Sequence, residues 1–471
     1  MLKHKEAYDA VIIGAGMSGL VCGCYLAKAG MKVLIAEQHS KPGGYCTSFK
    51  RKGFTFDAAA HSIGGYKYGY VGKVFKDLEI GKKIKFFKIN PSDTIITPDY
   101  KLSFWADTDM TIKEFQRAFP EERERIDRFF SFLANPDIKI FSRIRKWTFK
   151  NLLDKYFADE KLKTILSVPL FGNGGLPPTR MAAFVGVKIY QEFLLDGGYY
   201  PEGGMQALSD ALAERFMELG GELRLSSPVK KVKIKNNEVA GIILLDNDFL
   251  LSKYVVSNCD TRQTFFKLVG RHILDQEFID TIKTMIPSLS GFILYLGMDT
   301  QLTQLPEPGV NLWYLFFYNL DAAYLAAKRG DFRNIGGYVI HVSPDKKTVF
   351  VFINAPFKNK KYWNANKKKL LDFFIHRIES EAIPNLSKHI LFKDAATPLT
   401  LHRHTLNFKG AAFGWASTPS QLAMPDLRKP SFIRNLYLTG HWTTQGLGIP
   451  GVVYLGYDTA KMILRKQKAN L

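Results

Sequence analysis

The start of the chain has the clearest pattern of apolar and polar positions. An apolar run, 9–13, leads into a turn with glycines at positions 14, 16 and 19, and an alanine-rich stretch continues to Gly30. A second apolar run, 32–36, ends on the carboxylate of Glu37. This order predicts a strand, a glycine turn, a helix and a second strand, which is the βαβ unit that binds dinucleotides.

Each residue type in this unit has a physical reason. Gly14 permits the tight turn, Gly16 lets the backbone approach a pyrophosphate, and Gly19 lets the helix pack close to the strand. The helix N-terminus offers free N–H groups and a positive dipole end to the phosphates. Glu37 lies where an acidic side chain holds ribose hydroxyls, and a carboxylate there argues against the 2′-phosphate of NADP. A βαβ turn without a ligand is the structural alternative.

In the rest of the chain, apolar residues recur at helical spacing in some segments and at strand spacing in others. Helical spacing is expected over residues 105–199, and an amphipathic helix with Leu208, Leu212, Phe216 and Leu219 at helical spacing is expected after Met205 and ends at Gly220-Gly221. The expected strands and strand-rich runs are 229–235, 239–245 (joined to the preceding strand by Asn236-Asn237 as a hairpin turn), 290–357 and the step His402-Arg403-His404.

A second glycine-rich turn lies near the other end of the chain. The strand 435–440 is followed by Gly448-Ile449-Pro450-Gly451, and a helix is expected from about Val452. Two nucleotide-binding turns in one chain indicate one extended cofactor held by both, which favours FAD. A structural strand–turn–helix is the alternative, since a glycine turn alone is unspecific. No second complete G-x-G-x-x-G follows a strand, so a separate NAD(P)H domain is not expected.

Length and composition indicate a globular protein with more than one domain. The chain has 471 residues, of which 46% are hydrophobic, and this predicts two or three domains. No window holds the roughly 18 apolar residues of a membrane span, and the first strand leaves no room for a signal peptide. The four cysteines (Cys22, Cys24, Cys46, Cys259) lack zinc spacing, so no metal site is expected and a reduced, cytoplasmic location fits.

The charge balance changes this picture. The chain has 65 Lys+Arg against 44 Asp+Glu, a net charge of +21, which suggests an anionic partner or, alternatively, a solvated lysine-rich surface. Residues 138–163 contain eight Lys/Arg, three acids and interleaved aromatics. Lys139, Arg143, Lys146 and Lys150 form one helical stripe beside an apolar one, the pattern of a helix lying in a membrane interface. A helix packed on its own domain has the same pattern.

These segments, in their order along the chain, resemble a known flavoprotein family, the phytoene desaturase and carotenoid isomerase branch of the FAD-dependent amine-oxidase-like flavoproteins. The step from Asp57 to His61 is similar to the retinol saturase subgroup. The likeness covers essentially the whole chain, and it is carried by the N-terminal unit, Pro42-Gly43-Gly44, Phe56-Asp57, the stretch Tyr200 to Gly204, Ala396-Thr397-Pro398, the stretches 410–415 and 418–421, and the ending 436–451.

The resemblance implies an α/β fold with a Rossmann-type FAD-binding domain (GR2-like) and an inserted α+β substrate domain that docks on membranes. The FAD-binding domain is expected to combine residues 1–104, 200–289 and 391–471. The substrate, membrane-facing domain is expected to combine residues 105–199 and 290–390.

The FAD site is expected to draw on both ends and the middle of the chain. Two positions depart from the family pattern: Tyr45 stands where relatives often have arginine, and His441 where many have aspartate. Neither removes FAD, because backbone N–H groups do most of the phosphate binding, but both weaken the transfer of catalytic detail. The expected cofactor-binding residues are Gly14, Ala15, Gly16, Ser18, Gly19, Glu37, Gly44, Tyr45, Val229, Asn258, Gly440, Gly448, Ile449, Gly451 and Val452.

The expected function is that of an FAD-dependent oxidoreductase on a hydrophobic polyene or isoprenoid lipid at the membrane surface, by desaturation, saturation or cis–trans isomerisation. A flavin beside an apolar cavity suits such chemistry. His61 is the candidate catalytic acid or base because its side chain titrates near neutral pH, and the alternative is a histidine that orders the loop beside the flavin. A quinone, oxygen or a redox partner is the expected electron partner.

Two other functions fit parts of the pattern. One is a flavin amine oxidase with a small amine as its substrate. The other is a basic RNA-associated flavoprotein, which is disfavoured because the aromatics of the basic stripe lie on an apolar face rather than in a recognised RNA module. No nucleic-acid partner is therefore expected, and the protein is expected to associate with membranes peripherally.

Overall fold

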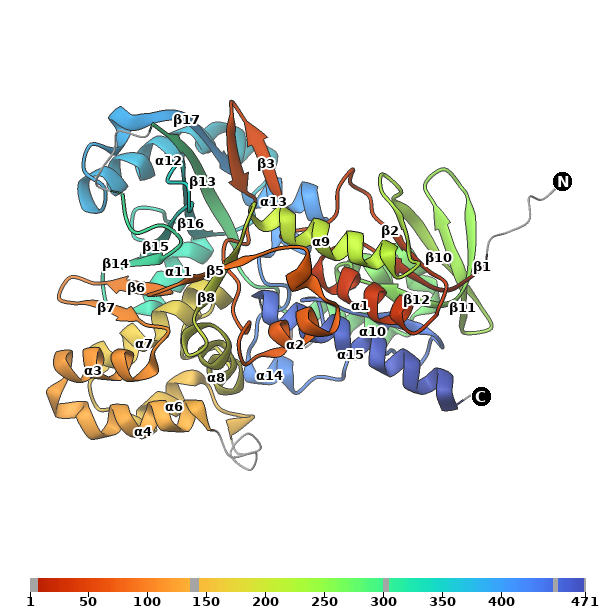
Figure 1. The fold of residues 1–471 in the computed structure, drawn as a ribbon, viewed down its shortest axis with the longest axis horizontal. Helices are drawn as coiled ribbons and strands as arrows, with labels where there is room; N and C mark the ends of the chain where they lie inside the picture. Colours follow the sequence, from red (N-terminus) through yellow and green to blue (C-terminus); the bar gives the residue numbers. More distant parts are fainter. Residues whose placement is uncertain (1–6, 136–143, 300–304, 444–447, 470–471) are drawn as a thin grey trace.

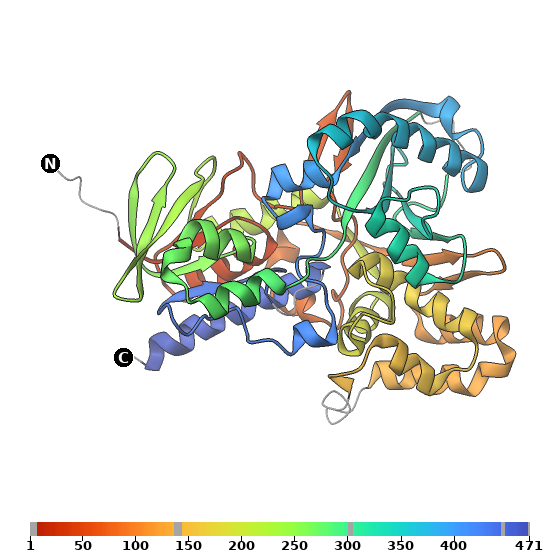
Figure 2. The ribbon, with the colours of Figure 1, turned by 180° about the vertical axis from the view of Figure 1, so that it is seen from behind.

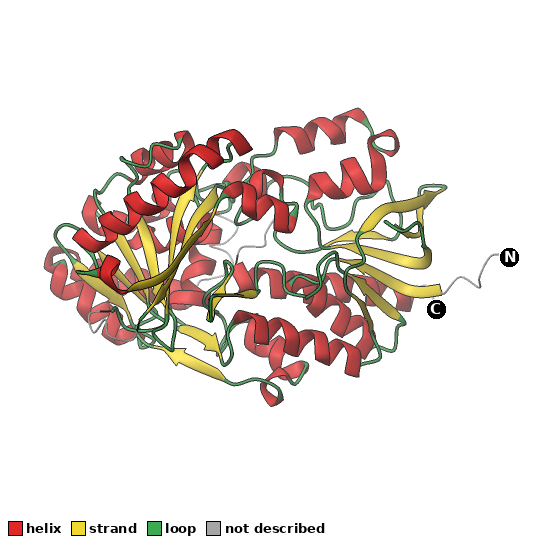
Figure 3. Ribbon diagram, turned by 90° about the horizontal axis from the view of Figure 1, so that it is seen from above, coloured by secondary structure: helices red, strands yellow, loops and turns green. Residues whose placement is uncertain are grey.

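The computed structural model describes residues 7–135, 144–299, 305–443 and 448–469. Its fold is α/β: two seven-stranded sheets lie along the longest axis of the molecule, with helices around and between them (Figures 1 and 3). β1 and α15, the first and last described elements, lie in the same half of the molecule (Figure 1).

The first sheet has the strand order β10-β11-β12-β1-β2-β9, and β18 pairs with β12. β1 runs parallel to β12 and β2, and β18 runs parallel to β12, so their carboxyl ends meet at one edge, where ligands bind in open α/β sheets. The predicted hairpin is confirmed, with Asn236 and Asn237 both at positive φ in its turn. The strands are β1 (Ala7–Ile13), β2 (Val33–Ala36), β9 (Glu222–Arg224), β10 (Val229–Lys235), β11 (Glu238–Leu244), β12 (Phe249–Ser257) and β18 (Leu436–Leu438).

Helices cover both faces of the first sheet, and alternate residues of β1 explain how. Ala10 and Ile12 pack on α1 (Met17–Lys28), α9 (Met205–Glu218) and α15 (Gly448–Ala469). Val11 and Ile13 face the other way, toward the π-helix Gln263–Gly270 and α10 (Gln276–Thr284), which Figure 2 shows from behind. A strand buried on both faces carries a continuous apolar run, which is the pattern at the start of the sequence.

The second sheet has the order β17-β13-β16-β15-β14-β6-β7. β13 lies between the edge strand β17 and β16, and it is buried along its whole length. The strands are β6 (Asp93–Ile96), β7 (Lys101–Phe104), β13 (Ser290–Met298), β14 (Asn311–Leu315), β15 (Gly337–Val342), β16 (Thr348–Ala355) and β17 (Ile390–Ala396), and helices α11 (Leu320–Arg329) and α12 (Lys360–Glu381) lie beside them.

The strands of the second sheet indicate that the proposed domain boundaries need to be moved. β6 and β7 lie within the range 1–104, yet β6 pairs with β14 of the second sheet. β17, which lies almost wholly in the range 391–471, pairs with β13. Both edges of the second sheet therefore come from segments assigned by sequence to the first domain, and we propose that the boundaries shift to about residues 90 and 397.

A group of helices forms the lower left of Figure 1 and covers one side of the second sheet. Residues 105–199 are mainly helical, as the sequence predicts. The helices are α3 (Thr108–Ala118), α4 (Arg123–Ala134), α6 (Phe149–Tyr156), α7 (Glu160–Gly174), α8 (Ala183–Ile189) and the π-helix Tyr190–Leu194.

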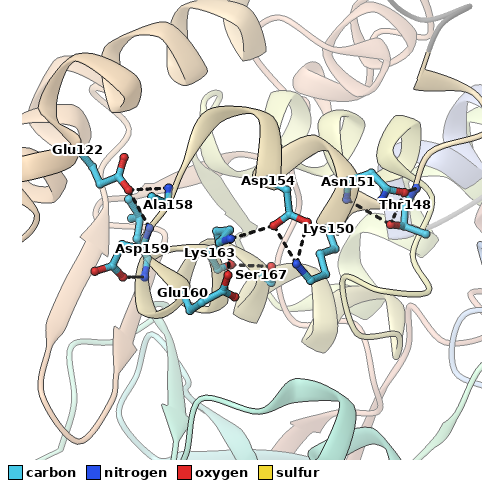
Figure 4. Close-up of polar contacts among 11 residues, drawn as sticks. Glu122, Thr148, Lys150, Asn151, Asp154, Ala158, Asp159, Glu160, Lys163 and Ser167 are labelled. Carbon is cyan, nitrogen blue, oxygen red and sulfur yellow. Dashed lines mark hydrogen bonds and ion pairs between the residues drawn. The ribbon is translucent and has the colours of Figure 1, made fainter.

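The basic segment 138–163 is not one helix. Thr148 begins α6 with a capping box, Phe157 is extended, and the Asp159 side chain accepts a hydrogen bond from Leu162 N to begin α7. Glu122 Oε1 accepts from both Ala158 N and Asp159 N at 2.7 Å, which fixes the corner between the two helices (Figure 4). Residues 138–143, with Lys139 and Arg143, lie outside the described residues.

The described apolar side chains of that segment are core residues. Ile144, Phe149, Leu153 and Phe157 are at most 4% exposed and pack among the neighbouring helices. Lys150 pairs with Asp154 at 2.7 Å, and Lys163 pairs with Asp154 and Glu160 (Figure 4). The interpretation of this segment as a membrane-interface helix is therefore wrong for the described part, because the apolar face needed for a bilayer is already buried inside the protein.

Shorter elements connect the two sheets. The step expected to be a strand at His402 and His404 is instead α13 (Pro398–Thr405), which begins with a capping box at Thr397 and Thr400. Within the described residues no helix combines the length and apolar content needed to cross a bilayer. The remaining elements used below are β3 (Ser48–Arg51), β4 (Phe54–Asp57), α2 (Tyr70–Asp77), β5 (Phe86–Ile89), β8 (Gly198–Pro201) and α14 (Pro419–Leu422).

Candidate cofactor and substrate site

A cavity of about 350 Å³ lies between the two sheets. One part of its wall comes from the carboxyl ends of strands in the first sheet and from the turns that follow them. The other part comes from strands β13 to β16 of the second sheet. Open α/β sheets bind their ligands at the edge where the carboxyl ends of their strands meet. The cavity also lies between the two sheets, and ligand sites are common at such junctions between parts of a protein.

The first wall is made mainly of glycine backbone. Gly14 has φ of +97° in the turn after β1, and Gly43 N donates to Ala15 O at 2.8 Å, which joins the two glycine turns. A Cβ on Gly16 would lie 2.8 Å from Asn258 Nδ2, so any other residue there would push the Asn258 side chain away from the turn. These turns form a cradle in which backbone N–H groups approach a ligand closely, as a pyrophosphate requires.

Glu37 closes one end of the cradle. Its Oε2 accepts from Ala15 N at 2.7 Å, and its Oε1 accepts from His39 N at 2.9 Å. The side chain is 7% exposed and lines the cavity, so two hydrogen bonds hold its carboxylate in place. Each oxygen keeps a further lone pair for a donor such as a ribose hydroxyl.

Asn258 connects the two glycine turns that are farthest apart in the sequence. It follows β12, and its Nδ2 lies 3.4 Å from Gly14 O. A Cβ on Gly440 would lie 2.5 Å from Asn258 Oδ1, so the C-terminal turn packs on the same side chain. Next to it, the hydroxyls of Ser18 and Thr439 hydrogen-bond at 2.6 Å. The structure therefore brings both ends of the chain together in one site.

Most of the predicted cofactor residues line this cavity, and three do not. A Cβ on Gly19 would collide with Gly14 O, so Gly19 allows the helix to pack close to the strand. Ala15 does not line the cavity, but its N–H donates to Glu37. Gly451 lies inside α15. The predicted residues that line the cavity are Gly14, Gly16, Ser18, Glu37, Gly44, Tyr45, Val229, Asn258, Gly440, Gly448, Ile449 and Val452, together with His61.

The two departures from the family pattern, Tyr45 and His441, lie beside one another. Their ring centroids are 6.0 Å apart, and the Tyr45 hydroxyl donates to Ala411 O at 3.0 Å. Burial raises the pKa of Tyr45 to about 12 and lowers the pKa of His441 to about 4, so both are neutral near pH 7. Neither side chain would add charge at a bound phosphate, so the backbone N–H groups of the cradle would have that role.

The second wall is made of apolar side chains. Among the described residues that line the cavity there is no lysine, arginine or aspartate, and the only carboxylate is Glu37, in the first wall. An apolar, uncharged wall favours a hydrophobic ligand over a charged one. Its principal side chains are Ile293, Trp313, Val339 and Phe352 on the strands, and Phe193 of the π-helix Tyr190–Leu194 adds to them.

His61 is the ionisable group at the join of the two walls. Its Nδ1 lies 3.0 Å from Ala59 O, and because a carbonyl only accepts, Nδ1 carries the proton and Nε2 is the unprotonated nitrogen; the side chain also interacts with Asn311. Burial is the largest influence on its pKa and lowers it, although nearby Asp57 and Asp93 oppose this effect. Neutral His61 is therefore able to accept a proton at Nε2.

A buried polar cluster supports His61 from behind, and sequence reasoning missed it. The His341 ring lies 5.0 Å from the His61 ring, and its Nδ1 lies 3.2 Å from Asn311 Oδ1. Asn311 Nδ2 and Trp313 Nε1 both donate to Asp93 Oδ1, at 3.2 and 2.7 Å. Burial lowers the pKa of His341 and raises that of Asp93. These residues lie on three strands far apart in the chain, so no local motif marks them.

The chain has clear similarity to known proteins. A family model of flavin containing amine oxidoreductases matches residues 17–464. The chain is 25% identical to the phytoene desaturase (lycopene-forming) of Pseudescherichia vulneris, over 96% of this chain and 98% of that protein. It is 23% identical to the all-trans-retinol 13,14-reductase of Danio rerio, over 92% and 82%, and 23% identical to the chloroplastic prolycopene isomerase of Arabidopsis thaliana, over 98% and 83%.

A solved structure has the same fold. An oxidoreductase from Methanosarcina mazei matches with a TM-score of 0.70 and 19% sequence identity, covering 96% of this chain and 99% of that chain. The glycine cradle fits the dinucleotide half of FAD, because its glycines have no side chains that would block a pyrophosphate and the Glu37 carboxylate is already held in position. Beyond the cradle the cavity is lined by strands of the second sheet, so these strands would face the flavin ring of a bound FAD.

Proposed function

Because the chain belongs to the flavin-containing amine oxidoreductase family and is therefore an FAD-dependent enzyme, we propose that its substrate is a hydrophobic polyene or isoprenoid lipid. The observation that carries this proposal is the uncharged second wall, formed by side chains such as Ile293, Val339 and Phe352. Similarity to a desaturase, an isomerase and a retinol reductase supports the same substrate class. Desaturation, saturation and cis–trans isomerisation are the three reactions of this proposal.

The proposed roles of the residues follow from their places in the cavity. The glycine cradle and Glu37 hold FAD, which supplies redox chemistry at its flavin ring. The second wall excludes water and orients an extended apolar chain. His61 Nε2 accepts or returns the proton that accompanies a change in double bonds, and the hydrogen bond from Nδ1 to Ala59 O holds its tautomer.

A flavin amine oxidase is the second candidate, and the family description favours it. A protonated amine entering this cavity would lose its hydration without gaining an opposite charge. Glu37 is the only described carboxylate of the lining, and both of its oxygens already accept hydrogen bonds from backbone N–H groups. The cavity therefore favours the polyene over the amine.

The electron partner and location complete the proposal. We expect exchange of electrons with a quinone, oxygen or a protein partner, because the sequence contains no second nucleotide-binding fingerprint. A hydrophobic substrate of this kind resides in membranes, so we expect the protein to work at a membrane surface. Rapid reduction of the flavin by NADH or NADPH in a stopped-flow experiment would contradict the first expectation.

The test is anaerobic incubation of the purified holoenzyme with candidate polyenes while the flavin spectrum is recorded. Bleaching of the oxidised flavin by a polyene identifies a desaturase. Product formed only from pre-reduced flavin identifies a saturase or an isomerase, which the mass of the product then separates. Bleaching by small amines with none by polyenes, together with peroxide formation in air, would replace the proposal with the amine oxidase.

A further inference from the structure

A second hollow, of about 730 Å³, lies on the surface of the first half of the molecule and is distinct from the cavity. We call it the tyrosine–lysine hollow. α2 forms one side, and the segment before α2 forms the other. Tyr68 is 76% exposed there, and Tyr70 beside it is 39% exposed. The residues that line the hollow are Tyr66, Lys67, Tyr68, Gly69, Gly72, Lys73, Phe75, Lys76, Glu79, Gly81 and Lys82.

Three lysines of the hollow form no salt bridge within the described chain, although the Asp196 carboxylate lies near Lys67. Lys67, Lys73 and Lys76 are exposed, and within the described chain none of them joins an ion pair. Lys67 Nζ lies 4.5 Å from the ring centroid of Tyr68, and Lys73 Nζ lies 5.3 Å from that of Tyr457. Lys82 differs, since Glu79 neutralises it. Exposed cations held against aromatic rings, which outnumber the single acid of the lining, Glu79, form a surface complementary to anions.

The segment that lines the hollow follows, a few residues later in the chain, the segment that lines the cavity. His61 and Ser62 line the cavity, and Tyr66 to Gly69 line the hollow a few residues later. Between them Gly65 N donates to Glu192 O at 2.5 Å, next to Phe193, which lines the cavity.

The far end of this segment is also held firmly. The Asp196 carboxylate accepts from Lys67 N at 2.9 Å and from Tyr68 N at 3.2 Å. α2 itself packs against α15, as Figure 1 shows. The exposed tyrosine is thus presented by a fixed backbone that also borders the substrate cavity.

We propose that the tyrosine–lysine hollow is the surface by which this protein docks on an anionic lipid bilayer. Lys67, Lys73 and Lys76 contact headgroup phosphates, and Tyr68 and Tyr70 lie at the level of the headgroups, where a ring with one polar end is most stable. A lipid substrate then leaves the bilayer beside the segment that borders both the hollow and the cavity. This inference rests on the proposed function for its substrate but not for its membrane contact.

Charge matching and ring exposure favour a bilayer over a soluble anion as the occupant. A soluble phosphate ligand needs converging donors, whereas here an exposed tyrosine stands out from the surface among the cations. The net charge of +21 attracts the whole molecule to an anionic membrane. The lysines of the hollow determine which face of the protein contacts it.

The test compares two triple variants of the FAD-loaded enzyme in co-sedimentation with vesicles of phosphatidylcholine and phosphatidylglycerol. K67Q/K73Q/K76Q removes three charges from the hollow. K150Q/K155Q/K161Q removes three charges from the basic segment, where Lys150 and Lys161 are paired with Asp154 and Asp99. We expect the first variant to bind about a hundredfold more weakly and the second to bind within about threefold of the parent.

A third variant, Tyr68→Ser, separates docking from general charge attraction. It keeps every charge, so we expect a loss of several-fold in vesicle binding that persists at high salt, where screening weakens the lysine contribution. Equal losses in the two triple variants, or no loss in the first, would overturn the proposal. Binding of inorganic phosphate by the parent, lost in K67Q/K73Q/K76Q while vesicle binding is kept, would replace the bilayer by a soluble anion.

The outcomes also distinguish this inference from the proposed function. Activity on a polyene supplied in detergent micelles should be the same in K67Q/K73Q/K76Q and the parent, and lower only when the polyene is supplied in vesicles. Vesicle binding with no polyene activity in either form would leave the docking surface intact and reject the proposed substrate. Polyene activity with vesicle binding unchanged in the variant would reject the docking surface alone.

Discussion

The two walls of the cavity are built in different ways. In the first wall the backbone does most of the work: Gly14, Gly16 and Gly44 leave space, and Asn258 locks the turns together. In the second wall side chains do the work: Trp313 and Phe352 fill the surface, and a buried cluster around His341 lies behind it.

The difference indicates what each wall is for. A backbone cradle recognises phosphates and ribose, which are the same whenever FAD binds, so its design depends on a few glycines and one carboxylate. A side-chain wall determines which substrate enters and where protons go, and these properties change with each side chain. Variants in the first wall should therefore affect cofactor content, and variants in the second should affect turnover with FAD still bound.

The largest effect is expected from Gly16→Val. A Cβ at this position would lie 2.8 Å from Asn258 Nδ2, and the branched side chain would occupy the space of the pyrophosphate. We expect a colourless protein without FAD, measured by the flavin absorbance after gel filtration. Gly81→Val is the matched control, because nothing lies within 4 Å of a Cβ at Gly81. Stoichiometric FAD in the Gly16 variant would refute the assignment of this turn.

The second effect is on turnover. His61→Gln removes the Nε2 base while keeping a polar side chain of similar size, and we expect the turnover number to fall about a hundredfold or more with FAD content unchanged. The control is His376→Gln, because the His376 side chain is 78% exposed and remote from the cavity lining. Full turnover in the His61 variant would make His61 a residue that only orders the loop beside the flavin.

The third effect is on stability in acid. His441 has its pKa lowered from 6.5 to about 4, so the unfolded chain binds a proton below pH 6.5 that the folded protein excludes until about pH 4. Stability is therefore lost as the pH falls through this window, by about 2 kcal/mol between pH 7 and pH 5. Chemical denaturation at both pH values measures the loss, and His441→Gln should reduce it. An unchanged pH dependence in that variant would mean that other groups determine it, such as His61 and His341.

The smallest effect is expected from Glu37→Gln. The amide keeps an acceptor oxygen for Ala15 N or His39 N but loses the negative charge and one acceptor for the ribose. We expect the affinity for FAD to fall about tenfold, corresponding to about 1.4 kcal/mol, measured by titration of the apoprotein. The turnover number at saturating FAD should stay the same, and a change in it would show that the first wall also influences the chemistry.

The first wall could be predicted from the sequence because its signals are local. Gly14, Gly16 and Gly19 lie within one turn of chain, and Glu37 follows at the end of the next strand, so spacing alone identifies them. The second wall could not be predicted, because Asp93, Asn311, Trp313 and His341 come together only when β6, β14 and β15 pair. His61 could be proposed from the sequence because the step from Asp57 to His61 is similar to a known subgroup and because histidine titrates near neutral pH. The residues that surround His61 in the structure could not be proposed in this way.

Two wrong interpretations have physical reasons as well. In the basic segment the charge pattern is the same for a helix that lies on a membrane and for a helix that packs on the protein's own core. The structure distinguishes the two, because Ile144 and Phe149 are buried inside the protein. At His402 and His404 the two-residue spacing suggested a strand, but Thr397-Pro398 with Thr400 is a helix-start signal that outweighs it.

The meeting of Ser18 with Thr439, and of Gly440 with Asn258, has a consequence for how the protein is made. A chain emerging from the ribosome completes the βαβ unit well before the part of the cradle that includes Gly440 and Gly448, which follows much later in the chain. We therefore expect tight binding of FAD only after translation has passed these residues. Until then α1 lacks α15, and the apolar surface that the two helices share is exposed to chaperones and proteases. The supply of free FAD in the cell should accordingly set the yield of folded protein, rather than only its activity.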